Sequence, residues 1–398
     1  MKKTLIALAA LGAMAGAAHA QSTVTLYGLI DVQGGSFKSN TYVAPVAPAT
    51  VGTFVSLSQT KIDNGALNGP RWGLRGVEDL GGGLKAVFNL ESGFGIDTGG
   101  STQGGLLFGR RANVGVSGGF GTVTVGRQSS AYADVAADHA MMLQSTFDPS
   151  NTNNGISIAN AQALAVAAAA YDLAPTAGTT NTLLQSSLNF SNRNTTWIGF
   201  SERFNNSIKY VSPTVGGITG GLFYAFGEDK TATVGASRTI GASLRYANGP
   251  ILASIGYQSE GGTRTATTKP ALENTGVNFA YDFGVARVGL GLNRAKYKDL
   301  VVGGVAADSD TFNESSLSVA VPMGALTLSA GVARSKNDDI GKSTGIGFQG
   351  IYDLSKRTKV YAGFGSTKTF DELANFAAAS GTSLGKTRSV AVGLRHVF

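Results

Sequence analysis

The sequence of 398 residues contains no cysteine and only three histidines. Disulfide bonds and thiolate metal sites are excluded, because both need cysteine sulfur. His19 lies near the amino-terminus, which leaves only His139 and His396 for acid–base or metal chemistry in the rest of the chain. No nucleophile stands beside a base in a catalytic arrangement, and no P-loop or zinc-ligand spacing occurs. We therefore expect no enzymatic activity, no metal and no cofactor.

Charged residues and long apolar runs are also scarce. Only 14% of the residues are charged, whereas an ordinary soluble surface carries about 25–35%. The best candidate for a membrane-spanning helix, residues 158–171, is shorter than the ~20 apolar residues that a span needs. A membrane protein without such helices has to be a closed β-barrel. The alternative is a large soluble β-protein, such as a propeller or a stack of sandwiches, with a charged exterior.

The first twenty residues have the features of an export signal. Lys2 and Lys3 form a basic start, a run rich in Ala and Leu follows, and Ala18-His19-Ala20 is a small-x-small cleavage site. We expect residues 1–20 to be removed and the working protein to comprise residues 21–398. Without Lys2 and Lys3 the chain keeps 30 basic and 25 acidic residues, a formal charge of +5. The basic residues are scattered singly, so no nucleic-acid partner is expected.

Alternation of apolar and polar residues dominates the rest of the chain. In residues 389–398, Val390, Val392 and Leu394 share one face, whereas Gly393 and Arg395 share the other. This period of two indicates a strand with lipid on one side and water on the other. The same pattern predicts sixteen antiparallel strands: 24–32, 71–77, 84–91, 107–116, 122–127, 207–211, 220–226, 241–247, 251–258, 276–281, 287–295, 316–321, 326–333, 345–352, 359–365 and 389–398.

Short and long connections alternate between these strands. Seven short segments are rich in turn residues: 79–83, 118–121, 212–217, 247–250, 282–284, 322–325 and 353–357. Eight longer polar segments separate them, which predicts an all-β transmembrane barrel with short periplasmic turns and long extracellular loops. The longest segment, residues 128–206, is either an exposed excursion or an inward-folded loop that narrows the bore. We favour the inward loop, because a sixteen-stranded barrel is otherwise a wide channel. The Ala-rich part, 159–170, is expected to include a short helix.

Several motifs, in order along the chain, resemble the general porins of Gram-negative outer membranes. They are Thr-Val-Thr-Leu-Tyr-Gly at 23–28, Arg-Trp-Gly-Leu-Arg-Gly-Val-Glu-Asp-Leu-Gly at 71–81, and the stretches 83–93, 107–111, 121–128, 206–213 and 393–398. The resemblance covers the chain apart from the signal and the loop interiors. It implies a homotrimer of sixteen-stranded diffusion channels with an inward-folded third loop. It also implies contact with outer-membrane lipid and lipopolysaccharide, and a terminal Phe398 that is read by the outer-membrane assembly machinery.

The resemblance further implies a ring of wall arginines that faces loop carboxylates across a constriction. Alternation alone places Arg71 and Arg75 on the water-facing side of the second strand, opposite Trp72 and Leu74. Three further candidates for the ring match the family by position: Arg110, Arg127 and Arg203. The register near Arg110 is ambiguous, because strict alternation from it turns Val114 and Val116 into the lumen; Arg111 could take the inward role instead. Arg127 needs a bulge at Gly126 to turn inward.

The loop acids that could oppose these arginines are Asp134, Asp138 and Asp148. Inward parity also predicts a positive pore lining by Lys209, Arg245, Arg287 and Arg395. Together with the net charge of +5, this predicts an outer-membrane porin for small hydrophilic solutes that prefers anions. Two alternatives stay open at this point: a substrate-specific channel for organic anions or phosphate, and a surface adhesin with a plugged barrel.

Overall fold

The structure is a computed structural model that describes residues 22–43, 53–152, 195–262, 264, 266–302, 305–309, 311–338, 340–372 and 384–398. Among these residues, no helix is long and apolar enough to cross a membrane. The predicted export signal, residues 1–20, and the predicted short helix at 159–170 lie outside the described residues.

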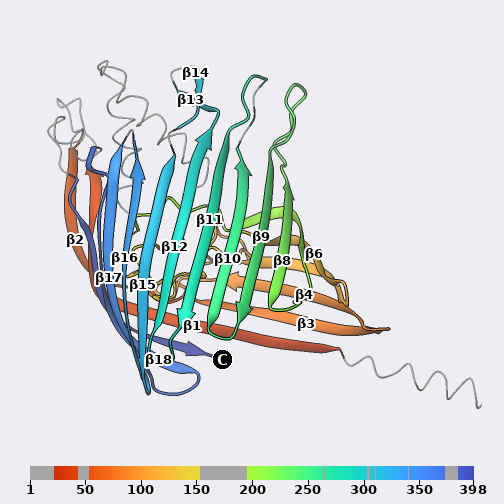
Figure 1. Cartoon of the computed structure of the whole chain (residues 1–398), viewed down its shortest axis with the longest axis horizontal. Coiled ribbons are helices and arrows are strands. Elements are labelled where there is room, and N and C mark those ends of the chain that lie inside the picture. Colours follow the sequence, from red (N-terminus) through yellow and green to blue (C-terminus); the bar gives the residue numbers. More distant parts are fainter. Residues whose placement is uncertain are drawn as a thin grey trace, which may run out of the picture.

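The described chain is almost entirely β-strand (Figure 1). The strands are β1 (Thr23–Val43), β2 (Thr53–Asn64), β3 (Arg71–Gly81), β4 (Leu84–Gly93), β5 (Arg111–Gly118), β6 (Gly121–Ser129), β7 (Arg203–Val211), β8 (Ile218–Phe226), β9 (Arg238–Asn248), β10 (Ile251–Gly261), β11 (Ala271–Asp282), β12 (Arg287–Lys298), β13 (Leu300–Val302), β14 (Val305–Ala307), β15 (Phe312–Met323), β16 (Leu326–Asn337), β17 (Gly341–Asp353), β18 (Thr358–Lys368) and β19 (Thr387–Val397).

One antiparallel sheet closes on itself into a barrel. Seventeen of the strands belong to this sheet, and the first and last strands of the chain pair with each other, Leu29–Lys38 of β1 against Arg388–Val397 of β19. On its other edge β1 pairs with β2 in its second half and with β3 in its first half. Because β2 and β3 lie end to end, they share one place in the wall, and the barrel has sixteen strand positions. The predicted fold class is confirmed.

Several predicted boundaries were wrong, although the number of strand positions was right. The prediction ended the first strand at Val32 and began the second at Arg71, whereas the pairing of β1 with β2 continues to Val43. The prediction missed this pairing because residues 33–41 contain one large apolar side chain, Phe37, and show no apolar alternation. Residues 107–110 precede β5 instead of belonging to it. The expected long connection at 334–344 is reduced to residues 338–340, because β16 and β17 pair out to Asn337 and Gly341.

All seven predicted short turns join neighbouring strands at one end of the barrel, and the β13–β14 hairpin lies at the other end (Figure 1). The carboxy-terminal residue meets the first part of β1 at the turn end, where the backbones of Gly28 and Phe398 exchange two hydrogen bonds of 3.1 and 3.0 Å. The Phe398 ring covers the space where a side chain at position 28 would lie. These contacts explain the glycine at position 28.

The two faces of the wall differ in chemistry. On β11, Val277 and Phe279 are exposed on the outside, whereas Asn274 and Asn278 are buried on the inside. The other strands repeat this alternation, for example with Leu290 and Leu292 on the outside of β12. Lipid can cover such an apolar exterior without leaving polar groups unsatisfied.

The described parts of the loop between β6 and β7, residues 130–152 and 195–202, fold into the barrel (Figure 1). We call this loop L3. From β6 it crosses the inner face of β10–β12, where the Tyr132 hydroxyl donates to Asn293 Oδ1 at 2.9 Å. It continues past β15, where the Ser318 hydroxyl donates to the His139 carbonyl at 2.9 Å, and past β17, where the Ser145 hydroxyl donates to Gln349 Oε1 at 2.7 Å. The inward-folded loop is therefore confirmed.

A track of glycines on the inner wall makes room for L3. Side chains at these positions would collide with Tyr132, His139, Met142 or Phe147 of the loop; they are Gly256, Gly276, Gly289, Gly291, Gly331, Gly347, Gly363 and Gly365. They come from β10, β11, β12, β16, β17 and β18, and most lie near mid-strand. Without side chains, the wall lets the loop backbone approach closely. These eight glycines therefore serve loop docking rather than turns.

The six residues between β2 and β3, 65–70, form a second inward feature, which we call the inturn. The Gly65 amide donates to the Asp31 carbonyl at 2.8 Å, and the Asn68 amide donates to Asp31 Oδ2 at 2.7 Å. The Tyr361 hydroxyl donates to Asp31 Oδ1 at 2.7 Å and accepts from the Ala66 amide at 2.9 Å. The Thr146 amide of L3 donates to the Ala66 carbonyl at 2.9 Å. L3 and the inturn thus meet inside the barrel.

The glycine track predicts that one methyl group can loosen L3. In Gly347→Ala, the new Cβ would collide with the Phe147 carbonyl oxygen, and overpacking of this kind costs about 1–3 kcal/mol. We expect proteinase K to cleave residues 140–152 at least about fivefold faster than in the parent, because local opening becomes more populated. Gly119→Ala is the matched control, since nothing lies within 4 Å of its added Cβ. Equal cleavage of the two variants would contradict the docking role of Gly347.

Candidate functional site

The inturn places a group of arginines on the inner wall at mid-height. Arg71 is the first residue of β3 and directly follows the inturn. At this point, about halfway along β1, β3 replaces β2 as the neighbour of β1. Arg110 lies just before β5, and its Nε donates to Glu91 Oε1 at 2.6 Å. Glu91 also lies 4.0 Å from Arg71 Nη1 and accepts the Tyr27 hydroxyl at 2.9 Å. A single carboxylate thus holds two guanidinium groups.

More cations surround this group. Arg203 pairs with Glu202 at 2.7 Å and lies within electrostatic reach of Arg71 and Arg110. Arg75 stacks its guanidinium over the Tyr27 ring, 5.2 Å from the centroid, as a cation–π pair. We call Arg71, Arg75, Arg110, Arg111 and Arg203 the arginine wall; Glu91 and Glu202 are the acids that contact it. The wall carries more positive than negative groups.

The register of β5 resolves the ambiguity around Arg110. Val114 and Val116 are exposed on the outside, and Asn113 pairs with the inward Asn89, so Arg111 has inward parity. Arg110 still reaches Glu91, because it precedes the strand and does not follow the alternation. Strict alternation from Arg110, which put Val114 and Val116 in the lumen, was therefore wrong for this strand.

Arg127 takes a different position from the arginine wall. The pairing shifts between Gly126 and Gln128, and Gly126 has a φ of 122°, as expected for a bulge. Arg127 nevertheless pairs with Ala112 of the outward face; its guanidinium donates to the Gly109 carbonyl and to Asn205 Oδ1, each at 2.7 Å. Among the described residues, no ion pair joins Arg127 to the wall. The bulge turns Gln128 inward instead, where it accepts a hydrogen bond from Thr124.

The loop acids are engaged by cations of other strands. Asp134 pairs with Lys209 of β7 at 2.5 Å, and Asp138 pairs with Arg245 of β9 at 2.9 Å. Burial raises the pKa of both carboxyl groups, and the neighbouring cations oppose this shift. Both acids therefore anchor the start of L3 to the wall.

Asp148 is buried within the loop, with only 1% of its surface exposed. Its Oδ1 accepts the amide and the hydroxyl of Ser150 at 2.9 and 2.7 Å. His139 Nδ1 donates to Asn278 Oδ1 at 2.8 Å, and His139 Nε2 lies 3.2 Å from Ser150 Oγ. The His139 ring stacks on Trp197 with 4.8 Å between the ring centroids. The structure thus places Asp148 in the packing of L3, away from the surface of the bore.

The predicted lining residues have inward parity along their strands. Arg287 pairs with Asp282 at 2.7 Å near the turn end. Arg395 of β19 stands opposite Asp31 of β1 in the register, so a cation and an acid are neighbours on the inner wall. Lys209 and Arg245 hold the acids of L3 described above. The interior therefore combines cations from at least five strands with fewer acids.

Two acids and one segment of this site were missing from the sequence-based prediction. Alternation already placed Glu91 on the inner face of its strand, so its role could have been found. Glu202 and the inturn gave no such signal, because both depend on contacts between distant segments. Across the described residues, no group of three His, Cys, Asp or Glu side chains could hold a metal ion.

Comparison with known proteins agrees with this architecture. The family model described as Gram-negative porin matches residues 7–371. An outer membrane porin protein of Bordetella pertussis is 30% identical, and outer membrane porin protein 32 of Delftia acidovorans is 32% identical; in both cases the match covers 100% of each chain. An anion-selective porin from Comamonas acidovorans has a similar structure, with a TM-score of 0.67, 25% identity, and coverage of 95% of this chain and 100% of that one.

A closed barrel with an apolar exterior, an inner loop and a charged lumen is the architecture of a pore through a membrane. The family match spans well over half of the sequence, and the two sequence relatives extend along all of it. The chain therefore belongs to the Gram-negative porin family and forms a barrel in the outer membrane through which solutes diffuse passively.

Proposed function

We propose that this porin prefers anions and that the arginine wall produces the preference. The observation that carries the proposal is the grouping of Arg71, Arg110 and Arg203 at mid-height around the acids Glu91 and Glu202. Low-dielectric walls strengthen the field of such a group, because water screens it less than on an open surface. The similarity to an anion-selective porin supports the same conclusion.

The position of L3 also favours an effect of the arginine wall on permeating ions. The start of L3 contacts β7–β9, and the rest of its described part packs against β10–β12 and β15–β18. The arginine wall belongs to β3–β7, mostly on the other side of the barrel. L3 fills space along one wall, so ions pass closer to the other. The acids Asp134 and Asp138 are already paired with Lys209 and Arg245. They therefore offset the positive charge of the arginine wall less than unpaired carboxylates would.

We also propose that the chain works as a homotrimer without enzymatic activity. Its membership of the porin family and its apolar exterior support this assembly. Contacts with lipopolysaccharide, and recognition of Phe398 by the assembly machinery, stay predictions of the resemblance. The exposed Phe398 ring, at 45%, is accessible to a partner at the turn end.

Removal of two wall cations should weaken anion preference. In Arg71→Gln with Arg110→Gln, we expect the chloride-over-potassium permeability ratio to fall at least about threefold, because two nearby charges at an effective dielectric constant of ~20 contribute several RT. Reversal potentials in a planar bilayer with a KCl gradient measure this ratio. Lys356→Gln, a change at an exposed turn residue, is the matched control. An unchanged ratio in the double variant would remove the arginine wall from the selectivity mechanism.

Glu91→Gln should have the opposite effect. The substitution removes the negative charge next to Arg71 and Arg110 and keeps a hydrogen-bonding side chain of similar size. We expect the chloride-over-potassium ratio to rise above that of the parent, and more strongly at low salt, where screening is weak. The same bilayer measurement at 0.1 M and 1 M KCl tests this. A fall in the ratio would show that Glu91 acts mainly by holding the arginines in place.

The trimer can be tested on the purified protein in detergent. We expect light scattering, corrected for bound detergent, to report three copies of the chain per particle. Chemical cross-linking at low protein concentration should give the same stoichiometry. A monodisperse single copy with normal channel activity would contradict the trimer and leave the proposed anion preference intact.

A further inference from the structure

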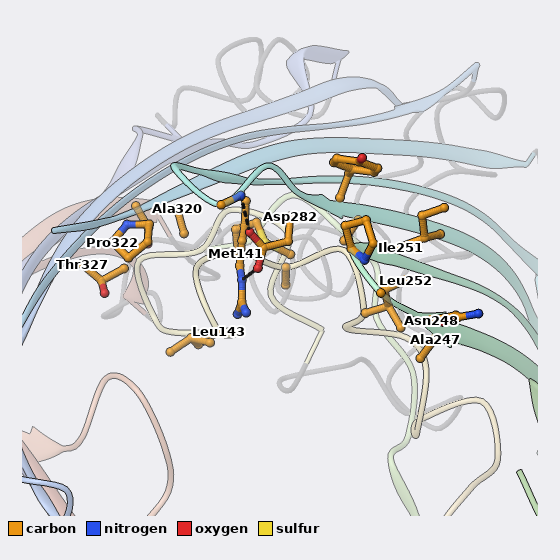
Figure 2. Close-up of a pocket in the computed structure, with 18 of the residues that line it drawn as sticks. Met141, Leu143, Ala247, Asn248, Ile251, Leu252, Asp282, Ala320, Pro322 and Thr327 are labelled. Carbon is orange, nitrogen blue, oxygen red and sulfur yellow. Dashed lines mark hydrogen bonds and ion pairs between the residues drawn. The ribbon is translucent and has the colours of Figure 1, made fainter. Parts of the chain in front are cut away.

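A cavity of about 900 Å³ lies between L3 and the turn end of the barrel wall (Figure 2). Met141 and Leu143 of L3 lie on one side, and Leu252 of β10 lies on the wall side. The arginine wall on β3–β7 does not line this cavity. A solute that has passed the arginine wall toward the turn end would therefore meet a second, separate environment.

Three cations border this cavity: Arg245 of β9, Arg287 of β12 and Lys359 of β18. Two strands separate Arg245 from Arg287, which sets their backbones roughly 14 Å apart across the sheet at ~4.8 Å per strand. The register also aligns Arg245, through Ser254 and Asn278, with Gly291, so Arg287 lies four residues, roughly 13 Å, further toward the turn end. The two arginines therefore border different parts of the cavity. Their side chains are 44% and 64% exposed, respectively, so water or a solute can contact both guanidinium groups.

The hydrogen-bonding capacity of the cavity favours an anion. Asp282, the one acid in the lining, uses Oδ1 to accept the Gly284 amide at 2.8 Å and Oδ2 to accept Arg287 Nε at 2.7 Å (Figure 2). Among the described residues, Arg287 has no other hydrogen bond, so both of its terminal nitrogens can donate to a solute. Arg245 bonds Asp138 through Nη2, which leaves further donors on the same group. Arg245 and Arg287 thus retain donors, whereas both Asp282 oxygens already accept a hydrogen bond. Lys359 pairs with Asp353 at 2.7 Å.

The apolar part of the cavity is unusual for a water-filled channel. Leu143 is 58% exposed and has a φ of +60°, and the next residue, Gln144, has a φ of +54°. The left-handed region costs a non-glycine residue about 1–2 kcal/mol. Asn151 holds this conformation by donating to the Gln144 carbonyl at 2.7 Å and the Ser145 carbonyl at 2.9 Å. The loop thus presents a leucine to the cavity in a strained conformation.

We propose that this cavity is a binding site for amphipathic organic anions, such as aromatic carboxylates. The carboxylate accepts hydrogen bonds from Arg287, Arg245 adds positive charge in another part of the cavity, and the apolar body contacts Leu143, Met141 and Leu252. An inorganic anion would use only the arginines, and an uncharged apolar solute would use only the leucines. Because an amphipathic anion makes both kinds of contact, it stays in the cavity for a longer time than a small hydrophilic ion does. The site goes beyond general anion diffusion and does not need the arginine wall.

Benzoate, compared with acetate, is a suitable probe in single-channel recordings with benzoate added at the turn-end side. We expect benzoate to reduce the chloride current of the parent with saturation on the order of 10 mM, in the range of weak small-ligand binding. Acetate has the same charge without the apolar body, and it should not saturate in that range. Equal effects of benzoate and acetate would overturn the proposal. The KCl reversal potential on the same membranes reports anion preference independently.

Two substitutions inside the cavity and one control outside it test whether benzoate binds there. Arg287→Gln should raise the half-saturating benzoate concentration at least about fivefold, because a charge-assisted hydrogen bond is lost. Leu143→Asn keeps a residue that tolerates the left-handed conformation, and it should raise this concentration about threefold through lost apolar contact. Arg357→Gln removes an exposed turn cation outside the cavity and should change it less than about twofold. If both cavity variants matched the parent, benzoate would bind elsewhere and the proposal would fail.

Discussion

Backbone hydrogen bonding without water is the constraint on which the rest of this structure depends. Inside a bilayer each unpaired N–H or C=O costs several kcal/mol, so a sheet has to close. Closure here requires β1 to pair with β19 on one edge and with both β2 and β3 on the other. The end-to-end arrangement of β2 and β3 leaves one interruption in the wall, the inturn. Its backbone is satisfied from inside the barrel, by Asp31, Tyr361 and the Thr146 amide of L3.

Closure with sixteen strand positions leaves a bore that side chains alone do not fill. L3 occupies part of this space, and it meets the same constraint, since its own backbone groups are removed from bulk water. Polar side chains of the inner wall satisfy them: Ser318 donates to the His139 carbonyl, Gln349 donates to the Met142 carbonyl, and Asn278 donates to the Val135 carbonyl. The buried serines and amides of the inner wall therefore do more than make it wettable. They replace the water that an exposed loop would bind.

Features that depend on local sequence patterns could be predicted, whereas features that depend on contacts between distant segments could not. Alternation is a local pattern, and it predicted the barrel, the turns and the inward side of Arg71 and Arg75. The extension of β1 to Val43 was not predicted, because Gln33, Gly34 and Ser36 give no apolar face. The reach of Arg110 into the lumen depends on the chain before β5, and the burial of Asp148 depends on the packing of L3. Both result from contacts between distant segments, which a period of two does not encode.

The glycine track and the arginine wall are two consequences of the same asymmetry. A strand that accepts the backbone of L3 cannot also carry a long charged side chain at the point of contact, because both would need the same volume. Strands β10–β18 therefore carry glycines, serines and amides at mid-height, and the long cations of the waist come from β3–β7. Cations on the loop side lie away from that contact, as Arg287 and Lys359 do near the turn end. The path of the loop thus determines where positive charge can line the bore.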